Sequence, residues 1–143
     1  MSNISKHLTY NQIIFSNTAL KYNIPNIPSN SNLEYIKDLA ENIYEPIYNK
    51  YDGKVYITSC YRSPELNSKL GGVKSSQHQA LRGAALDLVS TNPKVQNIEI
   101  FNWVLDNLEF DQLIAEKMDN EDNPKWLHIS YNKNSNRNQL IYT

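Results

Sequence analysis

Two histidines and one aspartate are the side chains of this sequence whose types and spacing could do chemistry. His78 ends a polar loop, and Asp87 follows inside an apolar run, where a carboxylate is costly to bury unless a positive group compensates it. The alternation of residues 126–131 places His128 on one face of a predicted strand. Two histidines and a carboxylate can hold a catalytic zinc with a fourth position open to water, or a non-haem iron. Spacing alone leaves both metals open.

Each of these side chains also has an ordinary structural role open to it. Asp87 could face solvent or pair with Arg82, and either histidine could be a hydrogen-bonded residue of the core. The chain has only three histidines, and the third, His7, lies in a polar N-terminal segment with no assigned role. That two of three histidines fall in one candidate ligand set favours the metal site.

Length and composition describe one ordinary globular domain. With 143 residues, 40% hydrophobic and 20% charged, we predict a single domain over 1–143, with an N-terminal helical part over 1–50 and a metal-binding core over 51–143. The net charge of -1 argues against nucleic-acid binding through the overall field, and no apolar run is long enough to span a membrane. The only cysteine, Cys60, is expected to be a small buried side chain.

The periodicity of apolar residues predicts the elements that must position the candidate ligands. We expect a helix over about 32–50 that is disturbed at Pro46, and a helix that starts at the Ser63-Pro64 pair. A third helix is expected over about 93–108, starting at Asn92-Pro93. Strands gather in the second half of the chain and are mostly joined by short loops, which predicts an α+β fold. The predicted strands are 54–59, 84–89, 111–116, 126–131 and 139–142.

Several separated motifs resemble the zinc D-alanyl-D-alanine carboxypeptidase and murein endopeptidase family, particularly its short phage and bacterial members. They are YRSPELN at 61–67, GG at 71–72, SQH at 76–78, GAALD at 83–87, FDQLI at 110–114 and WLHIS at 126–130. Segments 16–19, 26–28 and 39–46 resemble the N-terminal helical part of the same family. The resemblance covers nearly the whole chain in order, and this agreement is more specific than any single motif.

The resemblance implies the fold shared by these peptidases and the hedgehog signalling domain. That fold has a small, mostly antiparallel sheet packed with helices and a zinc cleft on the sheet. The resemblance further implies that His78, Asp87 and His128 bind Zn²⁺. Arg62 matches the arginine of the YRSP motif and would hold a substrate carboxylate or the developing oxyanion, the alternative being a surface salt bridge with Glu65.

Three further residues are candidates for substrate binding. Ser76 and Gln77 lie beside His78 and would orient it or touch the substrate, or else cap the turn. Trp126 shares the predicted face of His128 and would form a wall of the cleft, unless it is a core or edge aromatic.

The sequence departs from the family pattern at two places. The family spaces its first two ligands as HxxGxAxD, whereas His78 and Asp87 enclose two more residues, so we expect a wider loop and an intact ligand pair. Some relatives carry their general base three residues before the last histidine, where this chain has Lys125. We therefore predict that Glu116, at the end of the strand 111–116, is the catalytic base.

Relatives with the hedgehog-like arrangement carry a catalytic glutamate at the end of the strand that pairs with the last ligand's strand. A hairpin through 117–125 would bring Glu116 alongside His128 in this way. Glu121 and Asp122, within that loop, are the reserve candidates for the base.

The implied function is hydrolysis of peptide bonds in the stem or cross-bridge of bacterial peptidoglycan, either as a D-Ala-D-Ala carboxypeptidase or as an endolysin-type endopeptidase. One alternative is a non-catalytic wall-binding or virion structural module that keeps the fold, and another, on ligand type only, is an iron oxygenase. Peptidoglycan peptides are the expected partners, and a monomer is the expected state. The N-terminus lacks a secretory signal, so we expect synthesis in the cytoplasm of an infected host and delivery by a holin or as a virion component.

Overall fold

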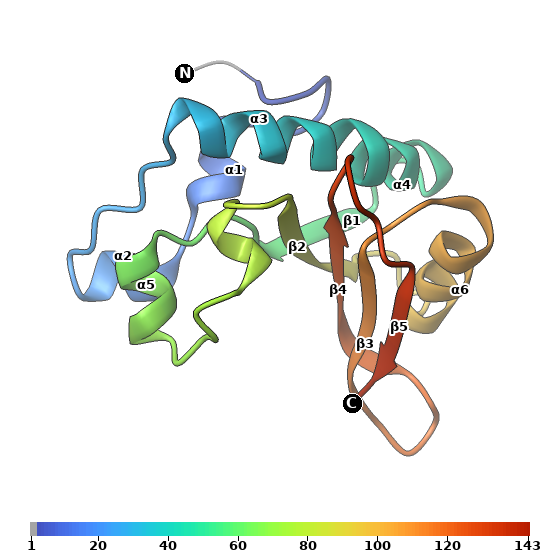
Figure 1. Cartoon of the computed structure of the whole chain (residues 1–143). Coiled ribbons are helices and arrows are strands. Elements are labelled where there is room, and N and C mark those ends of the chain that lie inside the picture. The colour runs from blue at the N-terminus through green and yellow to red at the C-terminus, as the bar shows by residue number, and fades with distance from the viewer. Residues whose placement is uncertain (1–2) are drawn as a thin grey trace.

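The fold, seen here in a computed structural model that describes residues 3–143, combines one sheet with short and medium helices (Figure 1). The strands are β1 (Val55–Ser59), β2 (Ala84–Ser90), β3 (Gln112–Met118), β4 (Pro124–Tyr131) and β5 (Gln139–Tyr142). The α-helices are α1 (Tyr10–Ile14), α2 (Asn17–Lys21), α3 (Asn30–Leu39), α4 (Glu45–Lys50), α5 (Pro64–Lys69) and α6 (Asn97–Asn107). A π-helical turn, η1 (Ala40–Tyr44), joins α3 to α4, and a 3₁₀ turn, η2 (Gln77–Gln79), precedes β2.

The sheet has the strand order β1-β2-β4-β3-β5. Its first three pairings are antiparallel, and β5 pairs with β3 in parallel. The predicted α+β class with a mostly antiparallel sheet is therefore confirmed, and β3 and β4 form the expected hairpin. Figure 1 shows α3 and α4 running as one long rod above the sheet, with α2 and α5 at one end of the molecule and α6 at the other.

The register of the three central strands separates a core face from a polar face. Directly paired residues share a face, so Leu86 with Ile129 and Leu88 with Leu127 point into the core, where all four are buried. The residues between them, Asp87 on β2 and His128 on β4, are paired with each other on the opposite face. The sheet thus holds the candidate ligands on the face that the core does not use.

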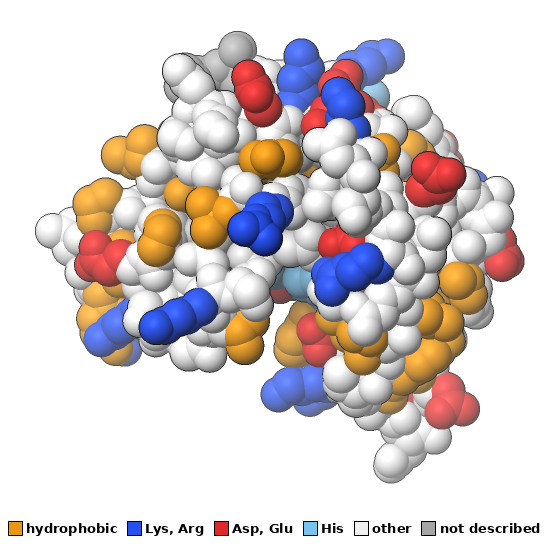
Figure 2. Space-filling view, in the orientation of Figure 1, with side chains coloured by type: hydrophobic (Ala, Val, Ile, Leu, Met, Phe, Trp, Pro, Cys, Tyr) orange, Lys and Arg blue, Asp and Glu red, His pale blue; other side chains and the backbone are white. Residues whose placement is uncertain are grey.

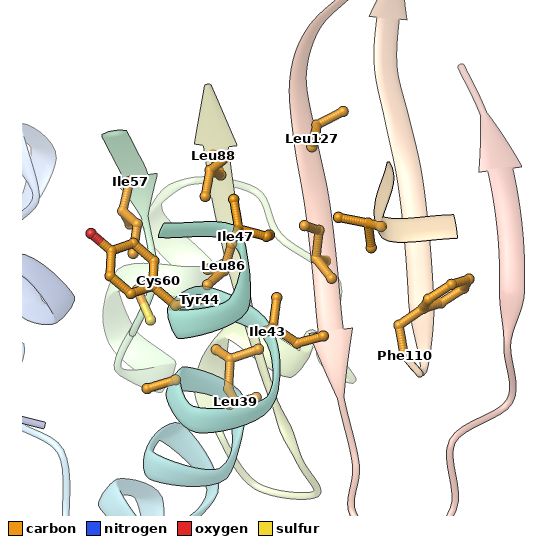
Figure 3. Close-up of a cluster of buried hydrophobic side chains, with 14 of the residues drawn as sticks. Leu39, Ile43, Tyr44, Ile47, Ile57, Cys60, Leu86, Leu88, Phe110 and Leu127 are labelled. Carbon is orange, nitrogen blue, oxygen red and sulfur yellow. The ribbon is translucent and has the colours of Figure 1, made fainter. Parts of the chain in front are cut away.

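The helices supply the other half of the core. Leu39, Ile43 and Ile47 recur at a spacing of four, are fully buried and lie over β2 (Figure 3). Ile100, Phe101 and Val104 of α6 and Leu8 and Ile13 near the N-terminus belong to the same buried cluster. Cys60 is 1% exposed, as predicted, and packs in this cluster.

The helix expected over 32–50 is one rod in space but not one α-helix. Its middle turn is the π-helical turn η1, and Pro46 follows as the second residue of α4. Proline lacks an N–H and crowds the carbonyl four residues earlier, and the wider π turn accommodates it without a sharp break. The predicted disturbance at Pro46 therefore takes the form of a π turn rather than a kink.

The expected start of the third helix at Asn92-Pro93 is wrong by four residues, since α6 begins at Asn97. Asn92 instead closes a separate turn, because its side chain accepts from Lys94 N at 3.0 Å and its carbonyl accepts from Val95 N at 3.0 Å. The helix start is capped from elsewhere, since Asn123 Oδ1 accepts a hydrogen bond from Ile98 N at 3.0 Å.

The start of α5 matches the prediction. Ser63 is its N-cap, with the side chain accepting from Leu66 N, and Pro64 is its first residue. Among residues 3–143, no helix is both long and apolar enough to cross a bilayer.

Candidate metal centre

Three side chains from three different elements meet on the polar face of the sheet. His78 comes from η2, Asp87 from β2 and His128 from β4, and one ligand atom of each lies within 4.8 Å of the others. Asp87 Oδ1 is 3.3 Å from His78 Nε2 and 3.2 Å from His128 Nδ1. The two extra residues between His78 and Asp87 are accommodated in the loop before β2, and the two side chains lie together.

The position of His78 is fixed by its own backbone and by the chain after β1. Ser76 Oγ accepts from His78 N at 3.3 Å, which caps the short turn, and Arg62 N donates to the His78 carbonyl at 2.8 Å. His78 Nδ1 lies 2.7 Å from the Cys60 carbonyl, which can only accept, so Nδ1 carries the proton. Nε2, the atom that faces Asp87, is therefore the ring nitrogen that is available to bind a metal once it has no proton.

Asp87 is an ionised carboxylate in a buried position. Burial alone raises its pKa, but hydrogen bonds from His128 and His78, and the charge of those rings, hold the pKa well below its usual range. Arg62 Nη2 lies 3.8 Å from Asp87 Oδ2 and adds a positive charge. The groups that compensate the charge of Asp87 are therefore two histidines and Arg62. Arg82, which the sequence offered as a partner, forms no ion pair with Asp87 within the described chain.

The donor set suits a divalent metal of the zinc type. Two imidazole nitrogens and one carboxylate oxygen converge, and the hydrogen bond from His78 Nδ1 to the Cys60 carbonyl directs Nε2 toward the site, an arrangement common in metal-ligating histidines. Cys60 lies close by but is not a ligand candidate, because burial and the charge of Asp87 raise the pKa of its thiol to about 12.

A cleft of about 510 Å³ opens beside the ligands. His128 and Glu116 line it, together with residues of the segment 73–82, the first half of β3 and the loop 132–137. Figure 2 shows it as a hollow between the part of the surface over α2 and α5 and the part over β3 to β5, with a pale blue imidazole surface at its bottom. An extended peptide could reach the metal ligands through this opening.

Glu116 lies on the polar face of β3 and lines the cleft. It is paired with Trp126 across the hairpin, so it is diagonal to His128 on the same face of the sheet. Thr143 Oγ1 donates to Glu116 Oε1 at 3.1 Å. The reserve candidates Glu121 and Asp122 lie in the exposed turn of the hairpin and are not among the residues that line the cleft.

The other predicted site residues lie at different distances from this cleft. Ser76 and Gln77 line it, whereas Trp126 lies farther along β4 and does not, with Lys117 Nζ 6.0 Å from the centre of its ring. Arg62 lines a separate, smaller hollow beside α2 and α5. Its guanidinium faces Asp87 and makes no ion pair with Glu65 within the described chain, and its Nε is buried without a hydrogen-bond partner there.

Sequence reasoning did not identify an ion pair that forms the far wall of the cleft. Asp111 is 2% exposed, and its two oxygens accept from Arg137 Nε at 2.8 Å and Arg137 Nη2 at 3.0 Å. Arg137 holds the pKa of Asp111 below its usual value against the opposing effect of burial. The position of Asp111 in the sequence, directly after Phe110 and before a strand, indicates a carboxylate next to the core. Nothing in the polar segment around Arg137 indicates that this arginine pairs with Asp111.

Comparison with protein-family models identifies a family for this chain. The family model described as Peptidase M15 matches residues 6–129, a span that contains His78, Asp87, His128, Arg62 and Glu116. No curated protein matches the chain. Because the family model spans most of the chain and the α+β fold agrees with it, this protein belongs to the M15 peptidase family.

Proposed function

We propose that this M15 peptidase is zinc-dependent and hydrolyses peptide bonds in the stem or cross-bridge of bacterial peptidoglycan. The observation that carries the proposal is the convergence of His78, Asp87 and His128 beside an open cleft that His128 and Glu116 line. Membership of the M15 family supports a peptidase. The resemblance to short phage members supports an endolysin-type role with delivery through a holin or within the virion.

His78, Asp87 and His128 would hold the zinc ion. Bound there, zinc supplies a water molecule of lowered pKa and polarises the scissile carbonyl. Asp87 contributes negative charge to the site, and the guanidinium of Arg62, 3.8 Å from Asp87 Oδ2, partly balances that charge. The hydrogen bond from His78 Nδ1 to the Cys60 carbonyl keeps the ring from turning away.

Glu116 would act as the general base and then as the general acid. It would accept a proton from the attacking water and return it to the leaving amine, a role that needs a carboxylate beside the ligands but not among them. Its place on the polar face, diagonal to His128, meets that requirement. The hydrogen bond from Thr143 would orient the carboxylate.

Arg62 and Ser76 would act on the substrate. Arg62 would stabilise the developing oxyanion, an effect worth about 3 kcal/mol for a well-placed donor. Ser76 lines the cleft and would contact the peptide, while Gln77 would position the cleft wall and Trp126 would flank a longer substrate.

The substitution Glu116→Gln tests the proposed mechanism. We expect hydrolysis of purified peptidoglycan to fall by at least about a hundredfold, because the proton acceptor is lost. Zinc content, measured by elemental analysis, should stay stoichiometric since the three ligands remain. Glu121→Gln in the exposed hairpin turn is the matched control and should keep full activity.

Three results would count against the proposal in different ways. Full activity of Glu116→Gln would remove Glu116 as the base, and a protein that never binds stoichiometric zinc would remove the metalloenzyme. Binding to cell walls without clearing in a zymogram would favour a non-catalytic wall-binding module. When hydrolysis occurs, the masses of fragments released from defined muropeptides assign the bond that is cut.

A further inference from the structure

The arginines of this chain are few and lie together around the site. Lysines and arginines number 14, but only Arg62, Arg82 and Arg137 are arginines. Arg62 faces Asp87, and both Arg82 and Arg137 line the cleft that contains His128 and Glu116. Arginine presents a planar fork of donors that matches a carboxylate, whereas lysine is a point charge.

One hydrogen-bond network holds the backbone of Arg82 and the side chain of Arg137 on the same wall of the cleft. Gln77 Nε2 donates to Asp111 Oδ2 at 2.7 Å and to the Arg82 carbonyl at 3.3 Å. Asp111 Oδ1 in turn accepts from Arg137 N at 2.9 Å and Arg137 Nε at 2.8 Å. The Gln77 amide keeps this orientation although its Oε1 is buried without a partner in the described chain. The loop before β2 and the loop before β5 are therefore tied to one carboxylate.

The two arginines differ in what they can offer a ligand. The charge of Arg137 is balanced by Asp111, but its side chain is 54% exposed, and within the described chain only Nε and Nη2 of the guanidinium donate hydrogen bonds. Arg82 is exposed and forms no ion pair among residues 3–143. Arg137 can therefore supply further N–H donors, while Arg82 supplies a net positive charge.

A second hollow extends the cationic wall. It has a volume of about 390 Å³, adjoins the cleft through Ser75, Ser76, Gln77 and Arg82, and adds Lys74 and Leu81 to its lining. Among residues 3–143, no acidic residue lines it. Figure 2 shows blue side chains on both sides of the first cleft, near the imidazole surface. An anionic group at this end of the cleft would meet Arg82 from either hollow.

We propose that Arg82 and Arg137 bind a free carboxylate of the peptide substrate, so that the enzyme selects peptides that are anionic beside the bond to be cut. This inference rests on the proposed function and specifies its substrate class. Arg82 lies in the loop that is two residues wider than HxxGxAxD, and Arg137 lies beyond the matched residues 6–129. The selectivity is therefore a property of this chain's own loops rather than of the shared peptidase motifs.

The test compares two substrates that differ only in whether their side groups are carboxylates or carboxamides. Muropeptides with free side carboxylates and the same muropeptides with these groups converted to carboxamides are hydrolysed by the wild type and by Arg82→Gln. We expect the wild type to favour the carboxylate form by at least about tenfold in kcat/KM, since hydrogen bonds to charged groups are the strong ones. Arg82→Gln should remove most of that preference by lowering kcat/KM for the carboxylate form. Lys133→Gln, an exposed charge change outside the cleft lining, should behave like the wild type.

A binding measurement separates this inference from the proposed function. Calorimetric titration of Glu116→Gln with both muropeptide forms needs no turnover and should show the same preference of about tenfold. Arg137→Lys, which keeps a cation beside Asp111, should reduce the preference in part. Equal binding of the two forms, or an unchanged preference in Arg82→Gln, would overturn the carboxylate site even if hydrolysis is normal. Absence of hydrolysis with a retained binding preference would overturn the peptidase mechanism alone.

Discussion

At the scale of single residues, the chain uses its three histidines in two different ways. His78 and His128 face the carboxylate of Asp87 at the candidate metal centre. His7, to which the sequence assigned no role, stacks on Tyr48 with ring centres 4.0 Å apart and donates from Nδ1 to Glu45 Oε1 at 2.6 Å. Glu45 also accepts from Ser5 Oγ and from His7 N, so one carboxylate fastens the N-terminal segment to the start of α4.

Glu45 is predicted to make stability depend on pH. Burial raises its pKa, but the hydrogen bonds from Ser5 and His7 outweigh that effect and lower the pKa in the folded state. The stabilisation is therefore complete above the ordinary pKa of a glutamate and is lost as pH falls through the lowered value. Glu45→Gln should cost about 1 kcal/mol in the free energy of unfolding at neutral pH, and the difference from wild type should shrink in acid.

Urea unfolding at neutral pH and at about pH 3.5 measures this difference. Glu41→Gln, on the exposed surface of the same rod, is the control and should change stability little at either pH. A loss in Glu45→Gln that stays constant with pH would show that the side chain acts by packing and not by charge.

At the scale of elements, strand pairing fixes the relative positions of two candidate ligands, and a loop fixes the position of the third. Asp87 and His128 are directly opposite in the β2–β4 register, so their relative placement follows from strand pairing. The position of His78 depends on the loop before β2, and this loop ends at Gly83. Gly83 has φ +84°, and a Cβ there would lie 2.5 Å from the Tyr131 carbonyl, so only glycine fits where this loop passes the end of β4.

Two glycine substitutions separate backbone strain from the close approach. Gly71 also has a positive φ, +74°, but a Cβ there would meet nothing within 4 Å. Both Gly71→Ala and Gly83→Ala should destabilise the protein because alanine disfavours this conformation, and Gly83→Ala should cost at least about 2 kcal/mol because of the added clash. Thermal unfolding of the two variants compares their losses of stability. Equal losses would mean that the backbone near the end of β4 can shift to accommodate the added Cβ at little cost.

The elements also show which parts of the site could be predicted from sequence. The alternation of residues around His128 predicts the strand face on which it lies. The resemblance to the family predicts that His78 and Asp87 lie beside it. Both predictions depend on short sequence patterns, which are visible without the fold. The start of α6 was missed because it is held by residues distant in sequence, since Asn123 Oδ1 accepts from Ile98 N and Asn97 Nδ2 donates to the Pro124 carbonyl. The Asp111–Arg137 pair was missed for the same reason, since its two members are joined only by the β3–β5 pairing and the fold around it.

At the scale of the whole molecule, one buried cluster joins the N-terminal helices to the sheet. Leu8, Ile13 and Ile36 pack in the same cluster as Leu86 and Ile129. We therefore propose that residues 1–143 fold as one cooperative unit, with the part over 1–50 covering the core face of the sheet. Equal calorimetric and van't Hoff enthalpies of unfolding would support this, and two separate transitions would contradict it.

Zinc is predicted to stabilise the whole fold, because its ligands come from η2, β2 and β4 and converge only when the chain is folded. At a free zinc concentration about a hundred times Kd, the gain is about 2.7 kcal/mol, which raises Tm by several degrees. Thermal scans with zinc and with a chelator measure the shift. His128→Ala should lose the shift, and His7→Ala should keep it from a lower starting Tm. A shift that persists in His128→Ala would place the zinc elsewhere.

The segment after β4 is attached to the rest of the protein by the pairing of β5 with β3, by the ion pair of Arg137 with Asp111, and by Thr143, which donates to Glu116. β5 joins the sheet edge at β3, and Asp111 receives Arg137 from the loop before it. None of the three candidate ligands, His78, Asp87 and His128, belongs to this segment. We therefore expect that transplanting residues 132–143 between M15 peptidases changes the wall of the cleft and leaves the candidate metal centre in place, provided that the acceptor keeps an aspartate before β3 and the transplanted segment keeps Thr143.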